Sequence, residues 1–190
     1  MAEVMCGFKA RVTNRFQPKG CVAFEVRSGA LVLDNSTELL FERWERFEHY
    51  QSVHSLQINR RPVRVVVAGE RCAVLVEGFC DELPPNKSDV FLVNGVQATI
   101  GGKGTIFHVY DASGVIAVDL EEGVLCQGDW IVIHGPDGFR HEQIAASIEV
   151  NQGYQETVIA GQTVSILIEV DPKNGFPTEG DTVTVVSIKK

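Results

Sequence analysis

Long apolar segments are missing from this sequence. A helix that crosses a bilayer needs about 20 predominantly apolar residues, and no run in the chain approaches that length. The first residues, "MAEVMCGFKA", place a Glu at position 3 and lack the apolar stretch of a secretory signal peptide. We therefore expect a cytoplasmic protein with no membrane association.

Cysteine is present, but without the spacing that binding chemistry requires. The number of cysteines is odd, and no two are spaced as C-x-x-C, which argues against a disulfide framework and against a structural zinc site. We expect reduced, mostly buried thiols and no metal. The five residues are Cys6, Cys21, Cys72, Cys80 and Cys126.

A nucleotide-binding loop is missing as well. A GTPase needs G-x-x-x-x-G-K-[ST] between a strand and a helix, so that backbone amides hold the phosphates and a hydroxyl holds magnesium. The nearest segment, "IGGKGT" (100–105), lacks the first glycine at that distance, and Gly104 follows Lys103 where Ser or Thr is required. The next residues, "TIFHVYD", have the pattern of a strand. We expect no nucleotide hydrolysis, no cofactor and no enzymatic activity.

Positive charge is scarce in the second half of the chain. Residues 96–190 hold 5 Lys and Arg against 13 Asp and Glu, whereas residues 1–95 hold 12 of each. Nine of the ten arginines lie in the first half. Such an asymmetry predicts two parts with different surfaces.

The two halves nevertheless carry matching patterns. "GCVAFEVRSGAL" (20–31) matches "GVIAVDLEEGVL" (114–125) at a shift of 94, and "FEHYQSVHSLQIN" (47–59) matches "FRHEQIAASIEVN" (139–151) at a shift of 92. The second shift also aligns Asp89 with Asp181, and a gap near residues 34–36 reconciles the two shifts. A register kept over most of about 90 residues indicates two copies of one unit.

The remaining pattern is that of short strands. Alternating segments rich in Val, Ile and Thr are separated by Gly, Asp, Asn and Pro, which is typical of small antiparallel barrels. "STELLFERWERFEHY" (36–50) has the apolar spacing of a helix, but its partner in the second copy contains the turn signal Pro136-Asp137-Gly138. We favour a hairpin of residues 37–42 and 46–51 over a helix.

These patterns predict an all-β protein of two tandem small antiparallel β-barrels. The first occupies residues 1–95 and is Arg-rich, and the second occupies residues 96–190 and is acidic. The join is "NGVQATIGGKG" (94–104), in which Gly101, Gly102 and Gly104 would give flexibility.

A family resemblance rests on the second copy. It reads "GVIAVDLEEGVLCQGDWIVI" (114–133), with Gly104 and Val109 before it and with "ASIEVN", "VIAGQTVSILIE" and Gly180-Asp181-Thr182-Val183 after it. This set resembles the domain II β-barrel of translational GTPases such as elongation factor Tu, over residues 102–188. The first copy departs from it, with "VLDNSTE" and "NKSD" at the two turns. The resemblance implies barrels of the translation-protein domain II type, in a stand-alone chain or in a piece of a larger factor.

Arginines of the first copy are the candidate binding residues. "NRRPVR" (59–64) holds Arg60, Arg61 and Arg64, whereas the matching "NQGYQE" has no positive charge. Arg43 and Arg46 flank Trp44 at the expected hairpin tip. Guanidiniums bind phosphates bidentately, and an aromatic side chain between them can stack on a base or anchor in a protein pocket. The alternative is a solvated face with a partly buried Trp.

For the histidines, the cysteines and two acidic loops, a structural role explains the sequence better than a functional role. His49 and His141 occupy equivalent positions, each with a Phe and a Gln two residues away, and we favour an inherited hydrogen bond over a row of ligand contacts. Three cysteines match valines of the other copy, which indicates packing positions: Cys21 with Val115, Cys72 with Val164, and Cys126 with Val32. "DELPPNKSD" (81–89) and "DPKNGFPTEGD" (171–181) are expected to be surface loops, because neither has the order of a calcium loop.

Three functional hypotheses follow. The leading one is a non-enzymatic binding module that binds RNA or a ribonucleoprotein through the first barrel. The alternative is a protein-interaction or structural module, in which the different surfaces of the two copies would suit head-to-tail self-association. An enzyme is the third, and no catalytic constellation in the sequence supports it.

Overall fold

The computed structural model describes residues 7–16, 20–43, 47–75, 83–169 and 175–189. Within these ranges the chain forms strands and turns and no helix, which confirms the all-β class. It follows that none of these residues belongs to a helix long and apolar enough to cross a membrane.

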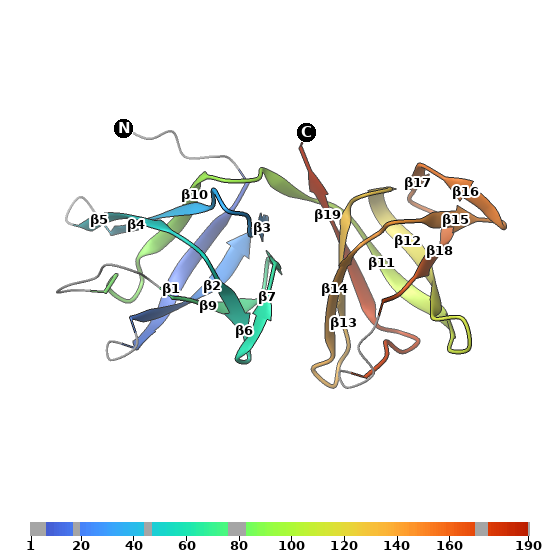
Figure 1. Cartoon of the computed structure of the whole chain (residues 1–190), viewed down its shortest axis with the longest axis horizontal. Helices are drawn as coiled ribbons and strands as arrows, with labels where there is room; N and C mark the ends of the chain where they lie inside the picture. The colour runs from blue at the N-terminus through green and yellow to red at the C-terminus, as the bar shows by residue number, and fades with distance from the viewer. Residues whose placement is uncertain (1–6, 17–19, 44–46, 76–82, 170–174, 190) are drawn as a thin grey trace. The chain divides into compact units, whose positions relative to one another are not determined.

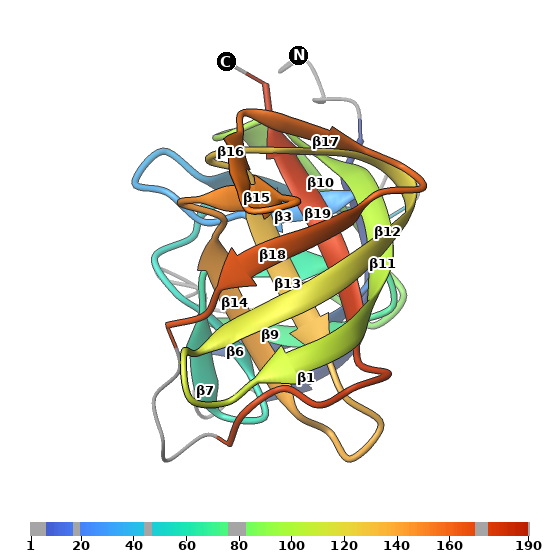
Figure 2. The ribbon, with the colours of Figure 1, turned by 90° about the vertical axis from the view of Figure 1, so that its right-hand side faces the viewer.

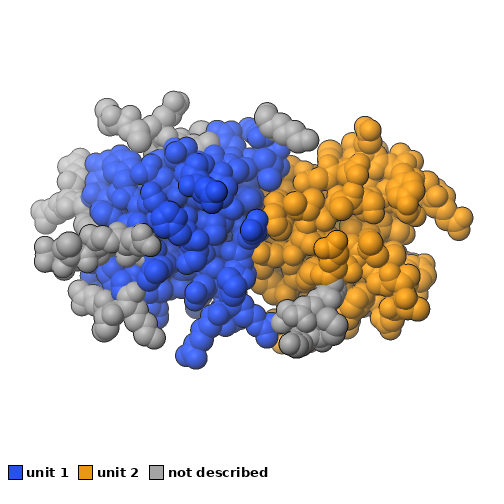
Figure 3. Space-filling model, viewed as in Figure 1, with its two compact units in different colours: residues 1–99, 188–190 blue, residues 100–187 orange. Residues whose placement is uncertain are grey.

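The chain divides into two compact units, which Figure 3 colours separately. Unit 1 consists of residues 1–99 with residues 188–190, and unit 2 consists of residues 100–187. The division falls inside a strand, four residues after the boundary expected from the sequence. The strands of unit 1 are β1 (Lys9–Phe16), β2 (Cys21–Ser28), β3 (Ala30–Val32), β4 (Glu38–Arg43), β5 (Phe47–Ser52), β6 (Leu56–Ile58), β7 (Arg61–Val63), β8 (Val65–Val67), β9 (Arg71–Leu75) and β10 (Asp89–Asn94).

Unit 2 contains the remaining nine strands, two of which reach the boundary between the units. The first two residues of β11 and the last residue of β19 belong to unit 1. The strands are β11 (Ala98–Tyr110), β12 (Val115–Cys126), β13 (Trp130–His134), β14 (Arg140–Ile144), β15 (Ile148–Val150), β16 (Gly153–Gln155), β17 (Thr157–Ile159), β18 (Thr163–Leu167) and β19 (Thr182–Ile188).

The two units share one topology. The large sheet of unit 1 has the order β5-β4-β10-β1-β2-β9-β6-β7, and that of unit 2 has the order β14-β13-β19-β11-β12-β18-β15-β16, which corresponds strand for strand. The pair β3–β8 corresponds to the end of β12 paired with β17. Each sheet curves around its own core, as Figure 1 shows for both units and Figure 2 shows closely for unit 2, where β13 passes behind β18 and β12. Two small antiparallel barrels are therefore present.

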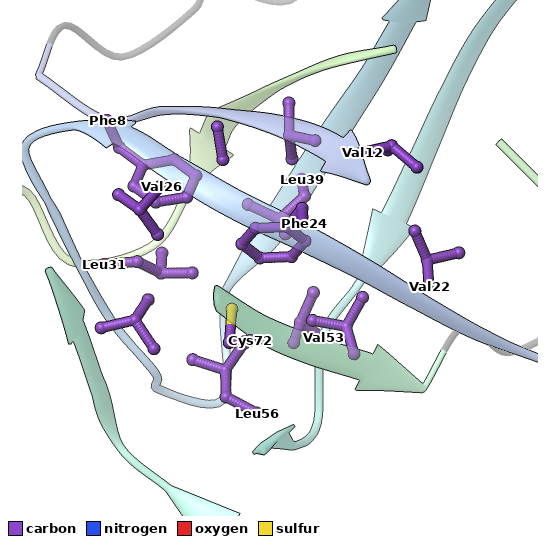
Figure 4. Packing of buried hydrophobic residues seen from close by; sticks show 14 of the residues in the cluster. Phe8, Val12, Val22, Phe24, Val26, Leu31, Leu39, Val53, Leu56 and Cys72 are labelled. Carbon is purple, nitrogen blue, oxygen red and sulfur yellow. The ribbon is translucent and has the colours of Figure 1, made fainter. Parts of the chain in front are cut away.

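Alternation of side chains builds each core. In β2, Val22, Phe24 and Val26 are buried while the residues between them are not, because successive side chains of a strand point to opposite faces. Figure 4 shows Phe8 and Phe24 among the aliphatic side chains of unit 1, with the Cys72 thiol in the same cluster. The two rings meet edge to face, with centroids 6.2 Å apart. Ile116, Val118 and Leu120 of β12 make the corresponding row in unit 2.

The segment with helical spacing is a hairpin. β4 and β5 pair antiparallel from Glu38–Ser52 to Arg43–Phe47. Leu39, Leu40 and Phe41 are buried, so burial in the sheet overrides the helix propensity of the Glu and Arg residues. The prediction of a hairpin is confirmed.

The glycines at the expected join are not a flexible linker. Gly101, Gly102 and Gly104 lie inside β11, and Gly102 and Gly104 are buried. A Cβ on Gly102 would lie 2.6 Å from the Glu122 carbonyl oxygen, and one on Gly104 would lie 2.5 Å from that of Asp119. The expectation of flexibility was wrong, because these glycines allow two backbones to approach closely, beside a register shift between Lys103 and Gly104.

The hydrogen bonds also correct one detail of the internal alignment. Val12 N donates to Ser88 O in unit 1, and Ile106 N donates to Asp181 O in unit 2. Ser88, and not Asp89, is therefore the structural equivalent of Asp181. The connection before β19, residues 168–181, is one residue longer than residues 76–88 before β10, and a constant shift could not detect that insertion.

Candidate nucleic-acid interface

The β6–β7 hairpin carries three of the six arginine and tryptophan candidates. Its strands pair as Leu56–Val63, Gln57–Pro62 and Ile58–Arg61, which leaves Asn59 and Arg60 as a two-residue turn. Both turn residues have positive φ, 51° and 67°, the backbone of a type I′ turn, whose twist matches that of the strands it joins. The turn holds Arg60 at its tip and Arg61 directly after it.

The three guanidiniums of this hairpin are on the surface. Arg60, Arg61 and Arg64 are exposed, while Val63 between them is buried in the core. Leu33 N donates a hydrogen bond of 2.7 Å to Arg64 O, which fixes the backbone where the hairpin leaves β7. Within the described ranges, Arg60 and Arg61 have no carboxylate at ion-pair distance. Both side chains are accessible to a ligand from solvent.

Unit 2 has a hairpin with the same backbone but without the positive charges. Its β15–β16 hairpin turns at Asn151 and Gln152, which have the same φ values of 51° and 67°. The residues that follow are Gly153, Tyr154, Gln155 and Glu156. The same scaffold thus presents three arginines in unit 1 and one carboxylate in unit 2.

The other candidates lie elsewhere. Arg43 is exposed at the end of β4, and Trp44 and Arg46 lie outside the described residues. β5 and β7 stand at opposite ends of the strand order, and Figure 1 shows the β4–β5 pair and the β6–β7 hairpin at separate places on unit 1. The structure therefore places Arg60, Arg61 and Arg64 on or beside one hairpin and Arg43 elsewhere on unit 1.

A row of charges on the outward face of unit 1 was not found from the sequence. Arg11 lies between Asp89 and Glu25 on neighbouring strands, and Glu25 faces Arg71. Arg11 Nη2 is 3.1 Å from Asp89 Oδ1, and Arg71 Nε is 3.6 Å from Glu25 Oε2. These partners are far apart in the chain, so only the strand register could have revealed them. Exposed ion pairs of this kind stabilise the fold by at most about 1 kcal/mol each. The guanidiniums of Arg11 and Arg71 are nevertheless already paired with carboxylates.

The paired histidines have a structural partner. His141 Nε2 lies 2.9 Å from Gln143 Oε1, and His49 Nε2 lies 3.4 Å from Gln51 Oε1. Gln143 also bridges two strands of unit 2, because its Nε2 donates to Leu167 O and its Oε1 accepts from Glu169 N. The hydrogen-bond interpretation of these histidines is confirmed in both units.

Core packing accounts for Cys72, and hydrogen bonds within a turn account for Asp181. Cys72 is buried in the core, Cys21 and Cys126 are half-buried and form no disulfide, and Cys6 and Cys80 lie outside the described residues. Asp181 is buried, and its carboxylate accepts hydrogen bonds from the Thr178 N–H and hydroxyl. Among the residues placed by the structure, no three His, Cys, Asp or Glu side chains are grouped so that they could hold a metal ion.

Comparisons with known proteins give only distant likenesses. No family model and no curated protein matches the chain. Two structures of the C-terminal domain of a protein described as a U32 peptidase, from Geobacillus thermoleovorans, align at TM-scores of 0.38 and 0.37 with 14% and 13% identity. They cover 44% and 47% of this chain and 96% and 93% of that domain. GDP-bound aIF5B from Aeropyrum pernix aligns at a TM-score of 0.35 with 11% identity, over 94% of this chain and 54% of its own length.

Proposed function

We propose that the protein is a non-enzymatic binding module whose unit 1 binds RNA, or the RNA surface of a ribonucleoprotein, through the β6–β7 hairpin. The observation that carries this proposal is the presence of three exposed arginines in and directly after one short hairpin, at its turn, at the start of β7 and after the end of β7. A guanidinium donates two parallel hydrogen bonds to a phosphate, and residues 59–64 contain no carboxylate that would compete.

The charge distribution defines where such binding is favourable. The formal net charge of −8 opposes phosphate binding by the whole chain. This charge comes from residues 96–190, and residues 1–95 are balanced. Because residues 1–95 carry as many positive as negative charges, a local basic site in unit 1 is compatible with the acidity of residues 96–190.

The shared topology supports two further parts of the proposal. We infer that the chain arose by duplication of one barrel, because the strand orders correspond and both hairpin turns have the same φ values. We also place both barrels in the translation-protein domain II type, on the sequence resemblance of residues 102–188. A cytoplasmic location fits structured RNA such as tRNA as the ligand to test.

The test is a titration of labelled bulk tRNA with the wild-type protein and with an Arg60→Ala/Arg61→Ala/Arg64→Ala variant. Each phosphate contact contributes about 0.7–0.9 to the slope of log affinity against log salt. Three contacts should therefore weaken wild-type binding about 20- to 40-fold between about 50 and 200 mM salt. The variant should lose most of its affinity and most of that salt dependence.

Two controls separate a local site from net charge. Lys87→Gln/Lys103→Gln/Lys189→Gln also removes three exposed positive charges, none of them on the hairpin, and should bind almost as the wild type does. Gln152→Arg/Gly153→Arg/Glu156→Arg places three arginines on the matching turn of unit 2 and should strengthen binding. Gly153 tolerates a side chain, since its Cβ would lie 3.5 Å from Val150 O. Absence of wild-type binding at the lower salt concentration would refute the proposal.

A further inference from the structure

Asn94, the last residue of β10, is directly followed by a glycine. The chain has seven asparagines, and only Asn94 and Asn174 precede a glycine. Asn94 is exposed, whereas Asn174 lies outside the described residues. Because glycine has no Cβ, its backbone nitrogen is not shielded by a side chain of its own. The nitrogen of Gly95 is therefore accessible to the side-chain amide of Asn94.

The structure holds these two groups in contact. Gly95 N donates a hydrogen bond of 3.0 Å to Asn94 Oδ1, which places this nitrogen beside Cγ, the carbon to which Oδ1 is bonded. Gly95 has a φ of 129°, a backbone conformation that few residues other than glycine adopt. Groups that are already held together react faster, because their encounter no longer costs entropy. The side chain of Asn94 is thus positioned for a reaction with its own main chain.

We propose that Asn94 is a site of spontaneous deamidation. Gly95 N bonds to Asn94 Cγ, and the bond between Cγ and Nδ2 breaks. The amide proton of Gly95 passes through water to the departing nitrogen, which leaves as ammonia. Water then opens the resulting cyclic imide at either of its two carbonyl carbons, so the only reactant needed is water. One opening gives an aspartate, and the other gives an isoaspartate, whose main chain runs through Cβ.

Both products place a new carboxylate opposite an existing one. Asn94 pairs with Glu38 of β4 at the end of the β10–β4 ladder, and like charges directly opposite each other on neighbouring strands are destabilising. The isoaspartate also lengthens the main chain next to Gly95, where even a Cβ would lie 3.2 Å from Thr37 Cα. Deamidation therefore weakens the pairing of β10 with β4.

Asn14 provides an internal control. Arg15 N donates a hydrogen bond of 2.9 Å to Asn14 Oδ1, and Asn14 is exposed as Asn94 is. The following residue is an arginine, whose side chain stands beside the attacking nitrogen. The two asparagines therefore share the hydrogen bond and the exposure, and they differ in whether a glycine follows.

The test is ageing of the wild-type protein in mildly alkaline, heavy-oxygen water, followed by trypsin digestion and mass spectrometry. We expect Asn94 to take up heavy oxygen from water and to convert at least about tenfold faster than Asn14. Asn94→Gln keeps a side-chain amide but requires a larger ring, so its peptide should not change. An Asn94 that converts no faster than Asn14 overturns the proposal. Cleavage after Lys and Arg gives each of these asparagines its own peptide: residues 88–103 for Asn94, 12–15 for Asn14 and 174–189 for Asn174.

The structural consequence has a test of its own. Asn94→Asp introduces the charge without ageing, and we expect it to lower the urea midpoint of unit 1, followed by circular dichroism, relative to Asn94→Gln. Glu38→Gln in the Asn94→Asp background should restore the midpoint, because it removes the opposing carboxylate. A midpoint of Asn94→Asp equal to that of Asn94→Gln would contradict the repulsion across β10 and β4. Neither experiment bears on RNA binding by the hairpin.

Discussion

Replacing Gly104 by alanine tests whether β11 needs its glycines for close backbone approach. The new Cβ would lie 2.5 Å from Asp119 O and 2.9 Å from Val118 Cγ1. Ordinary contacts begin near 3.4 Å, so β11 and β12 would have to separate by 0.9 Å, the difference between 3.4 and 2.5 Å. Gly104 does not have positive φ, so the backbone itself accepts alanine and the steric contact dominates the effect.

The expected cost follows from that contact. Forcing extra methyl volume into a packed site costs about 1–3 kcal/mol, and the lower chain entropy of alanine in the unfolded state returns about 0.4–1 kcal/mol. We therefore expect a loss of about 1–2 kcal/mol in the free energy of unfolding. With a urea dependence of about 1–2 kcal/mol/M, the unfolding midpoint of unit 2 should fall by about 1 M.

Tryptophan fluorescence during urea unfolding measures this change. The chain has two tryptophans, Trp44 and Trp130, so a Trp44→Phe background leaves Trp130 on β13 as the reporter of unit 2. Gly153→Ala is the matched control, because its Cβ would meet only ordinary contacts, and its effect should stay within about 0.5 kcal/mol. If Gly104→Ala were as mild as Gly153→Ala, close backbone approach would not be what requires a glycine at position 104, and our argument would be wrong.

Two further predictions concern polar side chains. Burial raises the pKa of Asp34, but hydrogen bonds from Thr37 and Ser36 outweigh it and hold the pKa below 3.8. A depressed folded-state pKa stabilises the protein above the unfolded-state value, so Asp34→Asn should cost stability at pH 7, and the difference should shrink as the pH falls below about 4. Thermal unfolding at several pH values measures this, and a constant difference would contradict it. Gln143→Ala removes the side chain that bonds to Leu167 O and Glu169 N and should cost about 1–3 kcal/mol in urea unfolding of unit 2. Gln127→Ala, which loses one bond to Ala146 O, should cost less, and equal costs would show that the bridge adds nothing.

The correct predictions came from sequence patterns that extend over only one or two strands. The hairpin of residues 37–42 and 46–51 was predicted because the matching segment contains Pro136-Asp137-Gly138, and burial of its apolar residues overrides the helical spacing. Cys72 was identified as a packing residue because its match is Val164, and both are buried. Such inferences succeed because alternation and turn chemistry are local properties of the chain.

The expectations that were wrong, and the features that the sequence did not reveal, concern contacts that are set by the register between strands. Gly101, Gly102 and Gly104 resemble a linker by composition, and only the approach of β12 shows why no side chain fits at Gly102 and Gly104. The one-residue insertion before β19 could not be detected from the sequence, because the segments on either side of it can be aligned with the first copy at one constant shift.

The sequence by itself determined the all-β class, the internal correspondence and the arginines of residues 59–64, because each depends on residue type and spacing along the chain. The tertiary structure decided which residues share a surface. It paired Arg11 with Asp89 and Arg71 with Glu25 across neighbouring strands. These neighbours are distant in sequence, and they meet only because hydrogen bonding between strands fixes one register among several that the same alternation would allow.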